Sequence, residues 1–147
     1  MFQIVVDCTR ARRMTQFWAT ALSYEVEPPP DGFATWNDYW RSIGVSEDEL
    51  DPDGDGGDFL RDPTGRGPRI RFQEIQEPKT VKNRPHFDLG VSGGRVVTLD
   101  QRKARVDAEV DRLVAAGARR VREVPTDGID HCDETMQDPE GNEFDVN

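Results

Sequence analysis

Histidine and aspartate stand together in the stretch that begins at His86, and both residue types bind metals and transfer protons. His86 and Asp88 alternate with the apolar residues Phe87 and Leu89. A strand here would therefore point both polar side chains to one face. Two interpretations of His86 stay open on this pattern: it ligates a divalent metal, or it is hydrogen-bonded to Asp88 or to the backbone.

A second candidate is His131, which lies between Asp130 and Cys132. Histidine and cysteine are both known metal ligands. Adjacent residues of a strand point to opposite faces, so a regular strand would not bring these side chains to one ion. We therefore interpret His131 as a residue at the edge of a loop.

The densest group of carboxylates is the run Asp51-Pro52-Asp53-Gly54-Asp55-Gly56, with Asp62 at the twelfth position. This spacing resembles a calcium-binding EF-hand loop, in which oxygen donors at alternate positions surround the ion. Three features oppose that reading: Pro52 inside the loop, Asp58 at a usually apolar position, and Pro63 where the exiting helix should begin. We interpret 51–58 as a solvated acidic loop and expect no calcium site over 51–62.

The elements that must position these residues occur twice in the same order. In the first half, strands are predicted at 2–8, 24–27, 33–36 and 68–75, and a helix carries Met14, Phe17, Trp18, Ala21 and Leu22 at helical spacing. In the second half, strands are predicted at 86–91, 119–124, 131–136 and 143–147, and a helix carries Val106, Val110, Leu113 and Val114. Short helical turns are expected between Tyr39 and Leu60.

A tight turn precedes the last strand of each half. Asp62-Pro63-Thr64-Gly65 and Asp138-Pro139-Glu140-Gly141 both combine proline, which presets φ, with glycine, which tolerates positive φ. After the second turn, Glu143, Asp145 and Asn147 alternate with Phe144 and Val146. We expect a βαβββ module at 1–76 with an acidic insertion near 46–58, a basic connector at 77–85, and a second βαβββ module at 86–147. Each module is too small to bury its own face well, which favours a shared sheet system.

Composition narrows the class of protein. Hydrophobic residues make up 35% and charged residues 33% of the 147 residues, and the net charge is −10. A chain this acidic is repelled by nucleic-acid phosphates and anionic membrane surfaces, so we expect neither partner. Met1 leads directly into an alternating apolar run and nothing resembles a signal or membrane-spanning segment, which predicts a cytoplasmic protein. Cys8 and Cys132 are expected to be free thiols.

The duplicated βαβββ order with Asp-Pro-x-Gly turns resembles the vicinal oxygen chelate superfamily of glyoxalase I, extradiol dioxygenases, and bleomycin and fosfomycin resistance proteins. The resemblance is to its small bacterial glyoxalase-like domains. It rests on Val6-Asp7-Cys8, Phe17-Trp18, Phe72-Gln73, the stretch from Glu77 to Arg84 followed by His86-Phe87-Asp88-Leu89, and Asp138 to Phe144. It implies an α+β fold in which two βαβββ modules form a curved mixed sheet around a cup-shaped cavity.

In that superfamily, metal ligands come from the first and last strands of each half. The resemblance assigns these positions to Gln3, Gln73, His86 and Asp145, each opposite its strand's apolar residues. The divalent metal would be Ni, Zn, Mn or Fe. Amides bind divalent metals poorly, and with Gln73 in place of an acid no second carboxylate remains as a general base. The sequence therefore leaves open whether the chain is an enzyme.

Two functions follow from the resemblance. The first is a glyoxalase-like protein that binds a small organic molecule in the cup, with metal-assisted lyase, isomerase or dioxygenase chemistry. The second is a metal-free ligand-binding or antibiotic-resistance protein that sequesters its ligand. Trp36, Tyr39 and Trp40 lie in the irregular region and are predicted to line the ligand pocket, with ordinary packing as the alternative. The resemblance also implies a homodimer.

Overall fold

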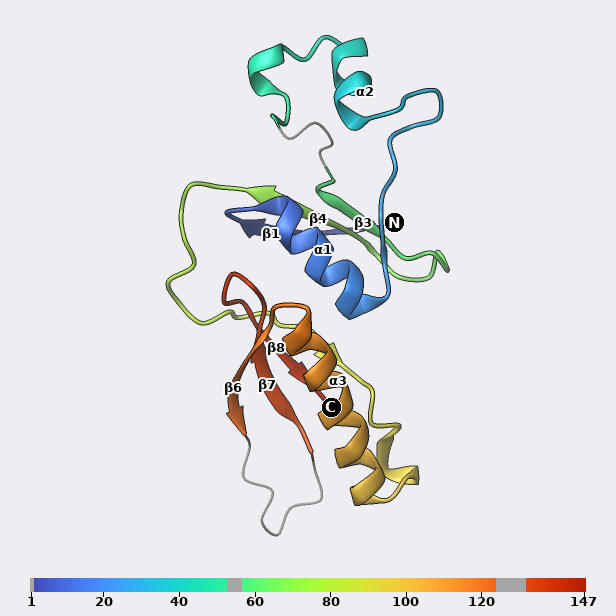
Figure 1. The fold of residues 1–147 in the computed structure, drawn as a ribbon, viewed down its shortest axis with the longest axis vertical. Coiled ribbons are helices and arrows are strands. Elements are labelled where there is room, and N and C mark those ends of the chain that lie inside the picture. Colours follow the sequence, from blue (N-terminus) through green and yellow to red (C-terminus); the bar gives the residue numbers. More distant parts are fainter. Residues whose placement is uncertain (1, 53–56, 124–131) are drawn as a thin grey trace. The chain divides into compact units, whose positions relative to one another are not determined.

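The computed structural model describes residues 2–52, 57–123 and 132–147. The chain forms two compact units, Met1–Ala19 with Ser23–Gln76 and Thr20–Leu22 with Glu77–Asn147 (Figure 1). Each unit carries its own four-stranded mixed sheet, and the described residues contain three α-helices. The predicted α+β fold is confirmed. That the modules curve around one cup stays a prediction.

The first unit has the strand order β1-β4-β3-β2. Its elements are β1 (Gln3–Cys8), α1 (Ala11–Leu22), β2 (Glu25–Val26), α2 (Trp36–Ser42), η1 (Glu47–Glu49), β3 (Phe59–Arg61) and β4 (Arg69–Glu74). β1 runs parallel to β4, whereas β3 is antiparallel to both β2 and β4. The α1 helix leads from β1 at one edge of this sheet to β2 at the other edge.

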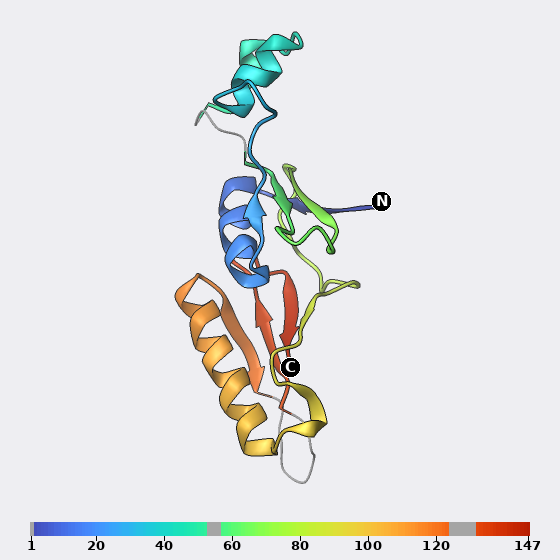
Figure 2. The same cartoon turned by 90° about the vertical axis from the view of Figure 1, so that its right-hand side faces the viewer.

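The core of the first unit forms from the apolar sides of α1 and the sheet. Both views show α1 lying along the sheet (Figure 1, Figure 2). The buried apolar side chains include Met14, Phe17 and Trp18, as expected from helical spacing on α1, and Ile70 and Phe72, as expected from alternation on β4; Leu60 of β3, where no strand was predicted, joins them. Glu74 reaches the same side, where its Oε1 accepts a hydrogen bond of 2.8 Å from the backbone N–H of Ala11. This carboxylate satisfies one of the exposed N–H groups at the helix start.

The strand predicted at 33–36 is wrong. Thr35 instead caps α2, and its side chain accepts a hydrogen bond from the N–H of Asp38. A threonine cap directs the following residues into a helix, and short-range alternation cannot reveal it. The third strand of the unit is β3, which follows the acidic insertion. The predicted short helical turns are confirmed by α2 and η1.

The second unit repeats the arrangement with the strand order β5-β8-β7-β6. Its elements are β5 (Asp88–Leu89), η2 (Gly94–Val96), α3 (Leu99–Ala115), β6 (Arg119–Glu123), β7 (Glu134–Gln137) and β8 (Glu143–Val146). Thr98 and Gln101 form a reciprocal capping box at the start of α3. The buried core contains Val106, Val110, Leu113, Met136, Phe144 and Val146. Figure 2 shows α3 running along this sheet.

Both predicted turns are present. The N–H of Gly65 donates to the carbonyl of Asp62 at 2.9 Å, and the N–H of Gly141 donates to the carbonyl of Asp138 at 3.0 Å. Both glycines have positive φ, +69° and +89°. The turns thereby place the final strand of each unit antiparallel to the strand before it. None of the helices within the described ranges combines the length and apolar character needed to span a membrane.

Candidate metal site

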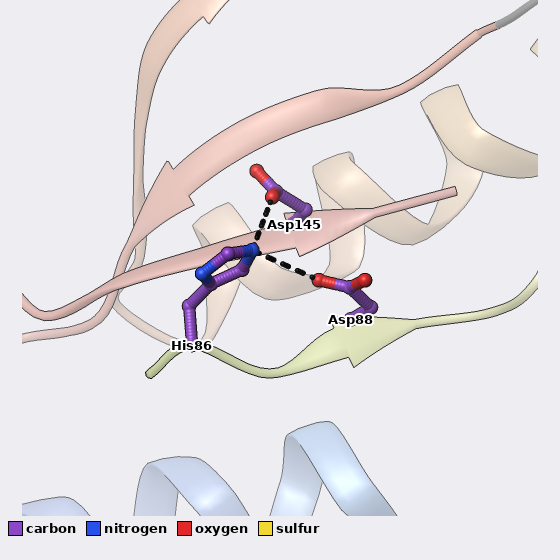
Figure 3. A group of neighbouring side chains, drawn as sticks. All are labelled: His86, Asp88 and Asp145. Carbon is purple, nitrogen blue, oxygen red and sulfur yellow. Dashed lines mark ion pairs between the residues drawn. The ribbon is translucent and has the colours of Figure 1, made fainter. Parts of the chain in front are cut away.

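His86 lies between two carboxylates of the second unit. Its Nε2 is 3.2 Å from Oδ2 of Asp145 and 3.3 Å from Oδ1 of Asp88 (Figure 3). The exposed fractions of the side chains are 40% for His86, 59% for Asp88 and 29% for Asp145. The three groups therefore converge at a site that solvent and small molecules reach.

Parallel pairing of β5 with β8 brings these residues together. Asp88 is the register partner of Asp145, and the carbonyl of Phe87 accepts the N–H of Asp145 at 2.9 Å. His86 lies two residues before Asp88, so it faces the same side of the sheet. Residues almost sixty positions apart in the chain thus become neighbours because the two strands run side by side.

Thr135 fixes the orientation of Asp145. It is the partner of Asp145 on the adjacent strand β7, and its hydroxyl donates to Oδ1 of Asp145 at 2.7 Å. The other carboxylate oxygen, Oδ2, is the one that faces His86. A hydrogen bond of this kind holds a ligand carboxylate in one rotamer and commonly tunes metal affinity.

The connector that leads to His86 is attached to β8 through Glu143. Lys79 Nζ lies 2.9 Å from Oε2 of Glu143, and the N–H of Asn83 donates to the same oxygen at 3.0 Å. Burial raises the pKa of Glu143, but the hydrogen bonds from Asn83, Lys79 and its own backbone outweigh it and lower the pKa to about 2. Lys79 belongs to the connector that the sequence marked as basic. Its side chain is only 18% exposed and binds a carboxylate.

The donor set of this site suits a divalent metal. One ligand atom from each of His86, Asp88 and Asp145 lies within 4.8 Å of the others. Within the described residues, this is the one group of His, Cys, Asp and Glu side chains that brings three such atoms together. One imidazole and two carboxylates form a nitrogen and oxygen set typical of Zn, Mn, Fe or Ni sites. The residues present therefore fit a divalent ion of this class.

Sequence reasoning missed the part that Asp88 can play. It placed Asp88 on the same face as His86 but considered it only as a hydrogen-bond partner. Because Asp88 lies two residues after His86, the sequence could also have suggested Asp88 as a second metal ligand. A third ligand would then have to come from a neighbouring strand. Thr135 had no signal in the sequence, because cross-strand neighbours depend on register.

The two glutamines assigned to the metal lie in the first unit. Gln3 is exposed on β1, and its Oε1 accepts a hydrogen bond of 2.9 Å from Nη1 of Arg69. A guanidinium that occupies the amide oxygen competes with a cation for it. Gln73 is exposed on β4 opposite Asp7. That these glutamines join His86 and Asp145 around one ion stays a prediction.

Strand register identifies the position in the first unit that corresponds to Asp145. When Gln3 is matched to His86, Val5 corresponds to Asp88, and the partner of Val5 on β4 is Arg71. Arg71, rather than Gln73, is thus equivalent to Asp145. The alternation of side chains along β4 cannot distinguish Arg71 from Gln73, since positions two apart in a strand share a face. The equivalent position carries a cation, which cannot ligate a metal.

The three predicted pocket residues belong to an aromatic cluster of the first unit. Trp36 is buried, and its Nε1 donates to the carbonyl of Glu27 at 2.9 Å. Its ring stacks on Trp40 at a centroid distance of 5.6 Å and meets Tyr39 at 5.9 Å. Trp36 therefore packs as a core residue of α2. Tyr39 and Trp40 are half-buried, and their role in a pocket stays a prediction.

Two further candidates fall at or beyond the limits of the described residues. Asp53 and Asp55 of the acidic loop lie outside them, and so does His131. Asp62 accepts hydrogen bonds from the hydroxyl of Thr64 and from the N–H groups of Thr64, Arg66 and Gly67. These bonds lower the pKa of Asp62 to about 2. They commit its carboxylate to the turn, which argues against a calcium loop that ends on it.

The chain is thus a duplicated βαβββ protein, in which the first and last strands of each unit pair in parallel. Its second unit presents an imidazole and two carboxylates as a candidate metal site. The model of the glyoxalase-like domain matches residues 3–147. The chain belongs to this family and thereby to the vicinal oxygen chelate superfamily. A comparison with curated proteins finds no match.

Several solved structures share the fold. A hypothetical protein from S. aureus is 16% identical, with a TM-score of 0.56 and coverage of 99% of this chain and 91% of that one. A glyoxalase/bleomycin resistance protein/dioxygenase family enzyme from Burkholderia phytofirmans PsJN is 17% identical, with a TM-score of 0.54 and coverage of 98% and 94%. A mutant of the fosfomycin resistance protein FosX from Listeria monocytogenes, in complex with Mn(II) and 1S,2S-dihydroxypropylphosphonic acid, is 13% identical, with a TM-score of 0.56 and coverage of 99% and 86%. At these identities, the likeness concerns the fold.

Proposed function

We propose that this glyoxalase-like protein binds a divalent metal through His86, Asp88 and Asp145 and uses it on a small organic molecule with adjacent oxygens. The observation that carries the proposal is the position of the His86 imidazole within 3.3 Å of both carboxylates. Asp88 supplies the second carboxylate that sequence reasoning missed when it relied on Gln73. One structure with the same fold, the FosX complex, contains Mn(II), and this supports a metal in a protein of this fold.

The side chains have distinct parts in this proposal. Asp145 is held by Thr135 and presents one defined oxygen, so it is the anchoring ligand. His86 offers Nε2 once the ion replaces the carboxylates as its partner. Asp88 is the most exposed of the three and completes the set from the solvent side. When bound, the metal would act as a Lewis acid on substrate oxygens, as lyases, isomerases and dioxygenases use it.

Metal titration tests the proposal directly. The purified protein, stripped with a chelator, is titrated calorimetrically with Mn²⁺, Zn²⁺, Ni²⁺ and Fe²⁺, the last without oxygen. We expect one site per chain, with affinity reduced at least about tenfold in His86→Ala and Asp145→Asn, because each removes one of three ligands. Asp88→Asn is expected to weaken the same site.

The chain provides a matched control in its second histidine. His131→Ala should retain the wild-type affinity, and Gln3→Ala and Gln73→Ala show whether the first unit adds ligands. The proposal is wrong if no metal binds more tightly to the wild type than to His86→Ala. It is also wrong if His131→Ala loses the metal while His86→Ala retains it.

A metal-free binding protein is the second candidate, and one observation favours it. His86 already has two carboxylate neighbours, 3.2 and 3.3 Å from its Nε2, without any ion. In that case the three residues stabilise the strand pair and the ligand is held elsewhere, without chemistry. Ligand binding that shifts tryptophan fluorescence, survives chelation and produces no turnover would support this candidate over the first.

The assembly and cellular location proposed from the family are tested separately. We propose a cytoplasmic homodimer, and light scattering after size exclusion measures the mass against the 16.7 kDa chain. A mass of one chain across the concentration range would refute the dimer. Fractionation of cells that express the tagged protein tests the cytoplasmic location.

A further inference from the structure

Two arginines of the first unit lie on one face of β4 but have different surroundings. Arg69 and Arg71 are two residues apart, so both side chains rise from the same side of the strand. The carboxylate of Glu27 binds Nε of Arg69, and the amide oxygen of Gln3 accepts from its Nη1. Among the residues that the structure describes, the buried Nε of Arg71 has no hydrogen-bond acceptor.

The ring of Phe59 lies beside both guanidinium groups. Phe59 is the register partner of Arg71 on β3, and its ring centroid is 5.5 Å from Cζ of Arg71 and 3.7 Å from Cζ of Arg69. A ring face attracts a cation and restricts the orientation of its side chain. It accepts no strong hydrogen bond, however. Phe59 therefore positions the guanidinium of Arg71 without satisfying its Nε.

Asp58 is the acidic group that interacts electrostatically with Arg71, but Asp58 forms no close ion pair with the guanidinium. Burial raises the pKa of Asp58, and the attraction of Arg71 only reduces that shift. Asp51 and Glu74, both nearby acids, raise the pKa of Asp58 further. No ion pair joins Arg71 to a carboxylate among the described residues, whereas Arg69 has one. The guanidinium group of Arg71 thus retains N–H donors suited to a planar anion.

We propose that Arg71 binds the carboxylate of a small aromatic ligand on the sheet face of the first unit. A carboxylate matches the side of the guanidinium that carries Nε, because two parallel N–H donors can bind its two oxygens. The aromatic part follows from the surroundings, since Phe59 contacts Trp36 at a centroid distance of 5.8 Å and this ring cluster continues through Trp40 and Tyr39. This anion site requires no metal and is independent of His86.

Benzoate and its neutral analogue benzamide provide the test. The metal-stripped full chain is titrated with each compound by calorimetry, and the Nε–H signal of Arg71 is followed by nuclear magnetic resonance after assignment by its loss in Arg71→Lys. Benzoate is expected to bind and shift this signal, whereas benzamide is expected to do neither. A charge-assisted hydrogen bond is worth enough for Arg71→Met to raise the dissociation constant about tenfold or more.

Two further variants separate the site from general charge effects. Arg71→Lys keeps the positive charge but loses the fork, so it should also weaken benzoate binding, by about tenfold on the same reasoning. Arg13→Met removes an equal charge from an exposed position on α1 and should leave the dissociation constant unchanged. Melting curves establish that each variant is folded, and Arg71→Lys replaces Arg71→Met if the latter is not.

Three results would overturn the proposal. The first is that the wild type does not bind benzoate. The second is that Arg71→Lys binds benzoate with the same dissociation constant as the wild type. The third is that Arg13→Met weakens benzoate binding as much as Arg71→Met does. The same titration in His86→Ala distinguishes the two sites. Benzoate binding that survives in His86→Ala keeps this inference even if no metal binds, and its loss there refutes an independent site.

Discussion

Glu143→Gln should destabilise the second unit and loosen the connector that carries His86. The wild-type carboxylate is 14% exposed and accepts from both Lys79 and the N–H of Asn83. Glutamine keeps the shape and one acceptor oxygen but loses the charge. It also leaves the ammonium of Lys79, itself only 18% exposed, without a counter-ion.

The magnitude follows from the pKa of Glu143. It falls from an ordinary value of 4.5 to about 2 in the folded protein, which corresponds to about 3 kcal/mol of folding stability at neutral pH. Because the folded pKa is the lower one, this contribution is complete above the unfolded pKa and is lost as the pH falls toward the folded pKa. About half of it should be lost near pH 3 by linkage. Since glutamine retains one hydrogen bond, we expect a loss of about 2 kcal/mol at pH 7.

Urea unfolding from pH 7 to pH 3, followed by far-ultraviolet circular dichroism, measures this effect. Tryptophan fluorescence is unsuitable, because Trp18, Trp36 and Trp40 all belong to the first unit. Hydrogen exchange of peptides that cover β8 localises the loss to the second unit. The matched control is Glu77→Gln, an exposed residue of the same connector, whose effect should stay within about 0.5 kcal/mol.

Two outcomes would refute the reasoning. One is a difference between wild type and Glu143→Gln that stays constant from pH 7 to pH 3, since the loss would then not come from the carboxylate charge. The other is a loss at pH 7 no larger than that of Glu77→Gln. Faster exchange confined to the first unit would likewise contradict the assignment.

Three other substitutions have defined outcomes. Asp138→Ala removes a buried carboxylate that accepts two backbone N–H groups of the turn and an amide of Asn142, so chemical unfolding should show a loss of about 2 to 4 kcal/mol. Gly67→Ala would place a Cβ 1.9 Å from Oη of Tyr24 and should lower the melting temperature. Thr135→Val removes the hydrogen bond to Asp145 and should weaken Mn²⁺ binding by about tenfold or more in calorimetry.

Each of these has a control on the chain. Asp111→Ala changes an exposed aspartate of α3 and should be nearly neutral, so an equal loss would contradict the account of Asp138. Gly90→Ala meets only an ordinary contact of 3.7 Å and should not change the melting temperature. Thr135→Ser retains the hydroxyl, and Mn²⁺ affinity that falls equally in the serine variant would exclude the hydrogen bond as the cause.

The candidate site shows where prediction from the sequence ends. The alternation around His86 was sufficient to place His86 and Asp88 on one face, and the alternation after Asp138 placed Asp145 opposite the apolar residues of its strand. Which strands are neighbours cannot be read from alternation. Only the parallel pairing of β5 with β8 brings Asp145 to His86 and makes Asp88 its direct partner.

The same limit applies to Gln73 in the first unit, whereas the correction at 33–36 has a local cause. Parity admitted Gln73 as the counterpart of Asp145, whereas the register selects Arg71. The strand expected at 33–36 is replaced by α2 because Thr35 caps a helix, and β3 instead follows the acidic insertion.

What the sequence by itself determined is local: the α+β class, the duplicated element order, the Asp-Pro-x-Gly turns and the buried faces of α1, α3, β4 and β8. These depend on residue preferences and periodicity over a few neighbouring positions, which act before any long-range contact forms. The tertiary structure decided the partners of charged groups. The hydrogen bond of Asp145 with Thr135 and the unsatisfied Nε of Arg71 depend on strand register, and the pair of Glu143 with Lys79 depends on how the connector lies against β8. In each case, opposite charges and donors meet only after distant segments come together.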